Sequence, residues 1–237
     1  MTGNITLLLG AAASIGLVHT ILGPDHYLPF IMLSKAGQWS MRKTMVVTLL
    51  CGIGHVLSSV ILGMTGIAFG IAVTRLEIVE SFRGSLAAWL LIGIGLAYFI
   101  WGIKKAIQNK PHTHLHSHND HPSHSHSHSH TGTHTHLHEN KAEKKMTPWI
   151  LFIIFAFSPC EPLIPLLMYP AAKSSIMGVF AVSVVFATAT IVTMLIFVYV
   201  FSYGLSYVPF QKLERYSHAI AGFTILLCGG AIQFLGL

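Results

Sequence analysis

Long apolar runs separated by short polar segments make up most of the chain. We place six such runs near residues 5–34, 44–73, 84–105, 148–170, 175–203 and 215–236. At about 1.5 Å of rise per helical residue, each run is long enough to cross roughly 30 Å of hydrocarbon. The first run exceeds the required length, which favours a tilted or broken helix. The pattern therefore predicts an all-α integral membrane protein with six transmembrane helices.

A shift of the sequence by 135 residues aligns the first three runs with the last three. The identities include Pro24 with Pro159, Leu28 with Leu163, Ala36 with Ala171, Ser40 with Ser175 and Gly95 with Gly230. Because each unit has three spans, the second copy has to be inverted in the membrane, as in many transporters. We therefore expect two inverted three-helix repeats, residues 1–105 and 148–237, joined by a polar segment at 106–147, with helices 1 and 4 broken. The alternative is that unrelated apolar runs align because they look alike.

Composition agrees with a membrane protein, since 53% of the residues are hydrophobic and 9% are charged. The net charge of +6 comes from basic residues scattered at the ends of apolar runs, which does not indicate nucleic-acid binding. Cys51, Cys160 and Cys228 all lie in apolar runs without CxxC spacing, so neither a disulfide framework nor a thiolate zinc site is indicated. The N-terminus lacks the basic stretch of a signal peptide, and we assign it to the first span.

The distribution of lysine and arginine predicts the orientation. With the N-terminus outside, the inner loops hold all of these residues except Arg75, Arg83 and Lys173. This is the bias of the positive-inside rule. We expect a multi-pass protein of the cytoplasmic (plasma) membrane, with both termini outside and segment 106–147 in the cytoplasm.

Five ionisable side chains fall well inside the predicted spans: His19, Asp25, His26, His55 and Glu161. Charged groups at such positions cost at least ~2.5 kcal/mol each, so they usually face a cavity and mark a pathway. Under the 135-residue shift, Asp25 and His26 align with Cys160 and Glu161, and His55 aligns with Thr190.

Proline-rich sequences surround these residues in both halves, GPDHYLP at 23–29 and SPCEPLIP at 158–165. Proline removes an amide donor and clashes with the carbonyl four residues earlier, so both helices should unwind here. Unwound backbone at membrane depth is tolerated where it lines a cavity enclosed by protein. The two breaks are therefore expected to form the walls of one site.

Imidazole, carboxylate and thiol groups in such a cavity suit a divalent transition metal, with nickel, cobalt, zinc or iron(II) favoured over magnesium or calcium. We predict His19, Asp25, His26 and His55 as ligands. Glu161, with Cys160 or Thr190, would supply the opposite wall or a proton-coupling group. Structural roles remain as alternatives for three of them: His55 could bond a carbonyl across helices, Asp25 could cap a half-helix, and Glu161 could be a helix-start acid.

Residues 112–138 are rich in histidine, mostly alternating with serine or threonine. The twelve histidines are His112, His114, His116, His118, His121, His124, His126, His128, His130, His134, His136 and His138. With almost no apolar residues to form a core, segment 106–147 should be a disordered cytoplasmic loop. Imidazoles at this density chelate late first-row metals, so we expect the loop to concentrate or buffer metal.

HTILGPDHYLPF, GHVLSS in the second run and the His-rich segment ahead of a Pro-Cys sequence resemble the UreH-type members of the NicO-like nickel/cobalt transporter group. The resemblance covers all six spans and implies that His19, Asp25, His26 and His55 bind the transported ion. This chain differs from the nickel permeases in the spacing of the motif, which is H-x4-D-H in the permeases and His19-x5-Asp25-His26 here. The nickel permeases also have more helices.

The same superfamily includes CcdA/DsbD-type membrane thiol carriers, which use one cysteine on each of two symmetry-related broken helices. Here Cys160 aligns with Asp25, and without a paired cysteine thiol–disulfide exchange cannot proceed within the chain. A metal sensor or storage accessory is a third reading. The sequence thus favours a transporter, not an enzyme, whose substrate is nickel or cobalt, with zinc or iron(II) as alternatives. Its expected partners are the lipid bilayer, metal ions and cytosolic metallochaperones, with no nucleic acid.

Overall fold

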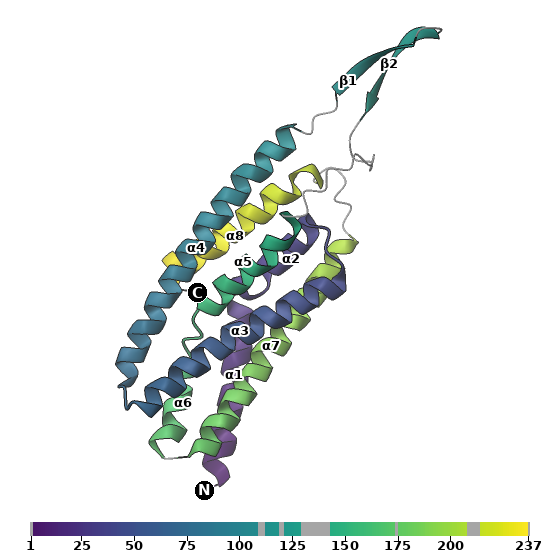
Figure 1. Ribbon diagram of the computed structural model, residues 1–237. Coiled ribbons are helices and arrows are strands. Elements are labelled where there is room, and N and C mark those ends of the chain that lie inside the picture. Colours follow the sequence, from purple (N-terminus) through teal and green to yellow (C-terminus); the bar gives the residue numbers. More distant parts are fainter. Residues whose placement is uncertain are drawn as a thin grey trace.

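The computed structural model describes residues 2–108, 112–118, 121–128, 143–173, 175–207 and 214–236, and most of them are helical (Figure 1). The helices are α1 (Thr2–Leu22), α2 (Leu28–Ala36), α3 (Met41–Ala68), α4 (Val73–Gln108), α5 (Glu143–Phe157), α6 (Leu163–Ala172), α7 (Ile176–Ser206) and α8 (Ser217–Leu235). Short 3₁₀ turns, η1 (Pro24–His26) and η2 (Glu214–Tyr216), precede α2 and α8. Two strands, β1 (His112–His118) and β2 (His121–His128), pair antiparallel.

Five of the described helices, α1, α3, α4, α7 and α8, are long and apolar enough to cross a membrane. Large apolar side chains are exposed all along the outside of the bundle, for example Leu7 on α1, Phe82 on α4 and Phe180 on α7. A lipid environment accommodates such side chains, whereas water would not. The chain is therefore a multi-pass membrane protein whose membrane-spanning part is all-α.

Helices α5 and α6 are shorter, and each of the predicted first and fourth spans is interrupted. Helix α1 ends at Leu22 and α2 begins at Leu28, with the Gly-Pro sequence between them. Helix α5 ends at Phe157 and α6 begins at Leu163, with Pro159 and Pro162 in the gap. Both interruptions fall where proline removes backbone donors.

Two serines cap long helices in the same way. The Ser40 hydroxyl accepts from the Lys43 amide at the start of α3 (3.3 Å), and the Ser175 hydroxyl accepts from the Gly178 amide at the start of α7 (3.1 Å). These caps satisfy amides that have no partner within the helix. The two serines are also aligned by the 135-residue shift.

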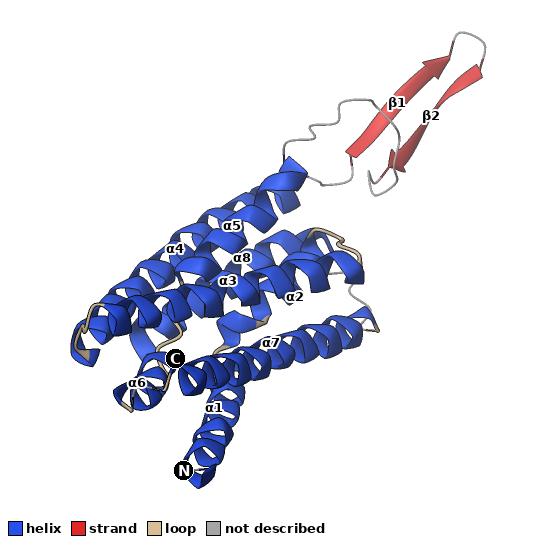
Figure 2. Ribbon diagram, turned by 60° about the horizontal axis from the view of Figure 1, so that its bottom comes forward, coloured by secondary structure: helices blue, strands red, loops and turns tan. Residues whose placement is uncertain are grey.

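Helices that are distant in sequence pack against one another over much of their length: α4 packs along α8, α1 along α7, and α3 along α5 and α7 (Figures 1 and 2). Glycine allows the α4–α8 pair to approach closely. A Cβ at Gly95 would overlap the Leu226 amide, and one at Gly102 would overlap the Ala219 amide. Small residues at such positions bring helix backbones together in membranes.

The buried apolar side chains form two clusters along the bundle. One contains Phe30, Cys51 and Phe155, and the other contains Val56, Cys160 and Phe186. Helix α3 contributes to both, since Cys51 and Val56 belong to different clusters. His55 lies on α3 between these positions and is fully buried.

Two features differ from the sequence-based expectations. Helix α4 begins at Val73 and not near residue 84, so Arg83, predicted to lie in an outer loop, is part of a helix. Strands β1 and β2 fall within the segment predicted to be disordered, and they pair in the register His112↔His128 and His116↔His124. His130, His134, His136 and His138 lie outside the described residues, and the proposed domain boundaries stay predictions.

Candidate metal centre

Three histidines from three elements meet inside the bundle. His19 lies near the end of α1, His26 in the turn η1, and His55 in the middle of α3. One ligand atom from each lies within 4.8 Å of the others, and no other group of this kind occurs among the described residues. His26 and His55 are 3% and 0% exposed. We call these three residues the histidine cluster.

The rings of His26 and His55 are arranged so that two nitrogens face each other. Nε2 of His26 and Nε2 of His55 are 3.3 Å apart. The rings of His19 and His55 are nearly parallel, 6.2 Å between centroids, and the His26 ring stands edge-on to both at 4.8 and 5.0 Å. Two nitrogens that bind one tetrahedral metal at about 2.0–2.1 Å are themselves roughly 3.3 Å apart. The His26–His55 spacing therefore suits a shared ion.

Hydrogen bonds on the far side of the His26 ring determine its tautomer. Nδ1 lies 3.0 Å from the Gly23 carbonyl and 3.2 Å from Oδ1 of Asp25. Both oxygens only accept, so Nδ1 carries the hydrogen, and the lone pair of the neutral ring is on Nε2. A carboxylate behind a metal-binding histidine is the usual way to orient the ring and raise its basicity.

Asp25 therefore has a different place from the other predicted ligands. Its carboxylate contacts the Nδ1 side of His26 and is not a member of the histidine cluster. The side chain is 5% exposed. Within the described residues, Nε2 of His19 and Nδ1 of His55 are buried without hydrogen-bond partners. A buried nitrogen with an unused lone pair is what an incoming cation would satisfy.

The Gly-Pro sequence positions His26 through local backbone bonds. The Gly23 amide still bonds the His19 carbonyl, and the Gly23 carbonyl accepts from the His26 amide at 3.1 Å. Pro24 cannot donate, so the helical pattern ends and a 3₁₀ turn follows. A Cβ at residue 23 would overlap the His26 ring, so the residue has to be glycine for the ring to fold back.

A cavity of about 440 Å³ joins the two helix breaks. Its lining residues come from the first break, the second break, α4 and the end of α8: His19, Asp25, His26, Ser158, Pro159, Glu161, Pro162, Ser81, Gly84, Ser85, Ile232, Gln233 and Gly236. We call it the break cavity. It brings Glu161 to the same space as Asp25 and His26, as the sequence predicts.

Cys160 and Thr190, the other predicted partners, do not line this cavity. The Cys160 side chain is fully buried in an apolar cluster. Thr190 is buried on α7, where a Cβ at Gly16 of α1 would lie 3.2 Å from its hydroxyl oxygen. Neither residue belongs to the histidine cluster.

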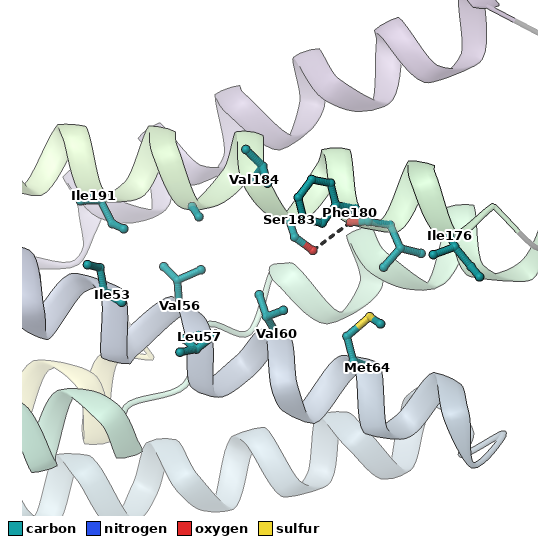
Figure 3. A pocket seen from close by; sticks show the side chains of 12 residues that line it. Ile53, Val56, Leu57, Val60, Met64, Ile176, Phe180, Ser183, Val184 and Ile191 are labelled. Carbon is teal, nitrogen blue, oxygen red and sulfur yellow. Dashed lines mark hydrogen bonds between the residues drawn. The ribbon is translucent and has the colours of Figure 1, made fainter.

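A second hollow, of about 500 Å³, lies between α3 and α7 (Figure 3). Apolar side chains line it, among them Val56, Val60 and Phe180. The hydroxyl of Ser183 points along its own helix and donates to the Val179 carbonyl at 2.8 Å. No imidazole, carboxylate or thiol lines this groove, so it is not part of the candidate metal centre.

Two charged residues near the centre were not among those predicted. Glu80 is 1% exposed, and Arg83 donates to its Oε1 at 2.8 Å. Both lie on the first turns of α4, ahead of the third apolar run at 84–105. The spacing of three residues between opposite charges on a helix is the signal that could have identified the pair.

Residues 28–231 match the family model for the transmembrane region of cytochrome c biogenesis proteins. The chain belongs to this family. No curated protein and no solved structure matches the chain. Membership of the cytochrome c biogenesis family supports the CcdA/DsbD side of the predicted resemblance and gives no support to the UreH-type or NicO-like group.

The cysteines of this family member do not form a visible pair. All three are free and buried. Cys160 lies at the second break, where CcdA/DsbD-type carriers would place a reactive thiol, but Asp25 stands at the aligned position of the first break. The break cavity instead brings carboxylate and imidazole groups together.

Proposed function

We propose that the protein carries a divalent transition-metal ion across the membrane, with His19, His26 and His55 as the binding residues. The observation that supports this most directly is the convergence of three imidazoles within 4.8 Å inside a membrane-spanning bundle. Buried polar groups at membrane depth are expensive and usually functional. A structural role would require hydrogen-bond partners for them, and Nε2 of His19 has none among the described residues.

The donor set favours nickel, cobalt, zinc or iron(II) as the transported ion. Neutral imidazole suits these metals, whereas magnesium and calcium prefer oxygen ligands. Three protein ligands leave coordination positions open, which permits an ion to enter and leave. Asp25 and Glu161 in the break cavity supply negative charge that offsets the cost of a buried cation.

The proposed architecture has six spans in two inverted repeats, with α1–α2 and α5–α6 each forming one broken span. Helix pairing supports it. In the two repeats, α1–α2 corresponds to α5–α6, α3 to α7, and α4 to α8. The contact of α1 with α7 should therefore have a counterpart between α5–α6 and α3, and the contact of α4 with α8 should be its own counterpart. All of these contacts occur. The excess of lysine and arginine in the inner loops supports a cytoplasmic position for the His-rich segment, where it would buffer metal or exchange it with metallochaperones.

Thiol–disulfide electron transfer is the second candidate, and the family match favours it. The reaction requires a thiolate that attacks a disulfide sulfur, so a second reactive sulfur has to reach Cys160. Cys51 belongs to a different apolar cluster from Cys160, and Cys228 lies on α8. The candidate therefore depends on a thiol supplied by a partner protein.

Metal flux into proteoliposomes tests the main proposal. Purified protein is reconstituted into liposomes that enclose a metal-sensitive dye. Nickel, cobalt, zinc and iron(II) are then added outside the liposomes in turn. We expect His26→Ala and His55→Ala to abolish flux of the transported metal. His218→Gln serves as the control, because His218 lies outside the histidine cluster and contacts Tyr98 and Lys105. Normal transport of every metal by His26→Ala would refute the proposal.

A further inference from the structure

The second helix break exposes two backbone groups that would otherwise bond each other. In a continuous helix the Cys160 amide would donate to the Ala156 carbonyl, four residues earlier. Here the last amide with a helical partner is that of Ser158, which bonds the Ile154 carbonyl at 2.8 Å. Pro159 has no amide hydrogen, and α5 ends.

Side chains of α3 and α4 bind both of these released groups. The Cys160 amide donates to the Ser59 hydroxyl at 3.1 Å. The Ala156 carbonyl accepts from Nη2 of Arg83 at 3.0 Å. The break is thus satisfied by partners from two other helices.

The charge of Arg83 is balanced within the same group. Nη1 of Arg83 donates to Glu80 at 2.8 Å, and Nη2 also donates to the Ser58 hydroxyl at 2.7 Å. Ser58 in turn donates to the His55 carbonyl at 2.8 Å. We call Ser58, Ser59, Glu80 and Arg83 the Arg83 cluster. It connects the second break to the backbone of a histidine-cluster residue.

The first break has a different construction. Its amides bond carbonyls of the same segment: Gly23 to His19, His26 to Gly23 and Tyr27 to Pro24. The first break therefore holds its shape through local bonds, whereas the second depends on an arginine that reaches across from α4. Helix α4 also packs against the second break directly, since a Cβ at Gly84 would lie 3.0 Å from Pro159.

We infer that Arg83 and Glu80 are positioning residues that hold the second break open and so keep Glu161 in the wall of the break cavity. Glu161 follows Cys160 directly, and its side chain is exposed to that cavity together with Asp25 and His26. If Arg83 is lost, the Ala156 carbonyl has no partner at the break, which favours its return to the Cys160 amide. That change would shift the segment around Pro159 and turn Glu161 away from the cavity.

The inference rests on the proposed function only for its consequence in transport, so its test uses no metal. Glu161→Cys places a thiol in the break cavity. The native cysteines are buried, so we expect them to react little with the label. Labelling with a soluble maleimide then measures access to position 161. We expect Arg83→Gln to slow this labelling by about ten-fold or more, since the partly buried Ala156 carbonyl loses its donor.

Matched variants separate positioning from general damage to the fold. Ser81→Cys reports on the same cavity from α4, and its labelling should not change when Arg83 is replaced. Arg75→Gln removes an exposed arginine from the same helix and should have no effect. Arg83→Lys keeps the charge beside Glu80 but lacks the planar fork, so it should restore labelling in part. If Arg83→Gln does not fold, Ser59→Ala removes the other partner without a change of charge.

Equal labelling of Glu161→Cys with and without Arg83→Gln would overturn the inference, as would a Glu161→Cys protein that is not labelled at all. Transport adds a second measurement. Arg83→Gln should lower the maximal rate of metal flux while the dissociation constant of the histidine cluster stays unchanged. A wild-type protein that moves no metal would refute the proposed function and leave the labelling result to decide the role of Arg83.

Discussion

Replacement of Asp25 by asparagine tests how the histidine cluster binds its ion. Oδ1 of Asp25 lies 3.2 Å from Nδ1 of His26, and the Gly23 carbonyl lies 3.0 Å from the same nitrogen. Asp25→Asn removes the negative charge but leaves the Gly23 carbonyl to hold the ring. Loss of a partner behind a metal-bound histidine weakens binding by about 10–100-fold. Because one acceptor remains, we expect about ten-fold, equivalent to roughly 1.4 kcal/mol.

The matched comparison is His26→Ala, which removes a ligand and not the group behind it. Loss of the His26 ring should weaken metal binding more than 100-fold, beyond the range for a residue that supports a ligand. Affinity is measured in detergent by competition with a fluorescent chelator, for nickel, cobalt and zinc. The measurements use a protein without residues 112–138, because that segment carries twelve of the 16 histidines and would bind ions itself.

Three outcomes are distinguishable in this experiment. A modest loss in Asp25→Asn and a large loss in His26→Ala agree with an orienting carboxylate. Equal, large losses would show that Asp25 is itself a ligand, as the sequence-based interpretation had it. Unchanged affinity in both variants would refute the assignment of the ion to the histidine cluster, whatever the transport assay gives.

Further predictions concern packing, the His-rich segment and the thiol. Gly95→Ala should lower stability by about 1–3 kcal/mol in thermal unfolding, because the new methyl group overlaps the Leu226 amide. Gly93→Ala, where nothing lies within 4 Å, should instead gain up to about 1 kcal/mol of helix propensity, and a loss of stability equal to that of Gly95→Ala would contradict the α4–α8 packing. Deletion of 112–138 should reduce the number of ions bound per chain without slowing flux, and abolished flux would make the segment part of the pathway. Cys160→Ser should leave metal flux unchanged, whereas lost transfer of reducing equivalents with normal flux would favour the thiol carrier.

The position of the histidine cluster could be predicted because its signals are local. Pro24 and Gly23 predict a helix break, and polar residues inside an apolar run indicate a cavity. Those rules identify His19, His26 and His55 without knowledge of their distances. They do not distinguish a ligand from its supporting group, since Asp25 and His26 are neighbours in sequence, and the difference depends on how the ring rotates.

The Arg83 cluster could not be predicted in the same way. Arg83 and Glu80 precede the most apolar part of α4, so hydropathy assigns them to a loop, and arginine outside an apolar run is ordinary. Their burial results from tertiary packing, because α4 extends past Gly84 and presses against Pro159. The hydrogen bond from Arg83 to the Ala156 carbonyl joins residues 73 positions apart, a separation that no local pattern encodes.

Family membership and the proposed metal site are compatible because a fold does not determine the chemistry placed on it. Two broken helices that face one cavity offer the same framework for different side chains. Thiol exchange would require a sulfur at each break, and this chain has Cys160 at one and Asp25 at the other. The Cys160 thiol is also fully buried, while the cavity between the breaks presents Asp25, His26 and Glu161. The residues at the first break therefore bear on which of the two functions the chain has, and in this chain they are a carboxylate and an imidazole, Asp25 and His26, and not thiols.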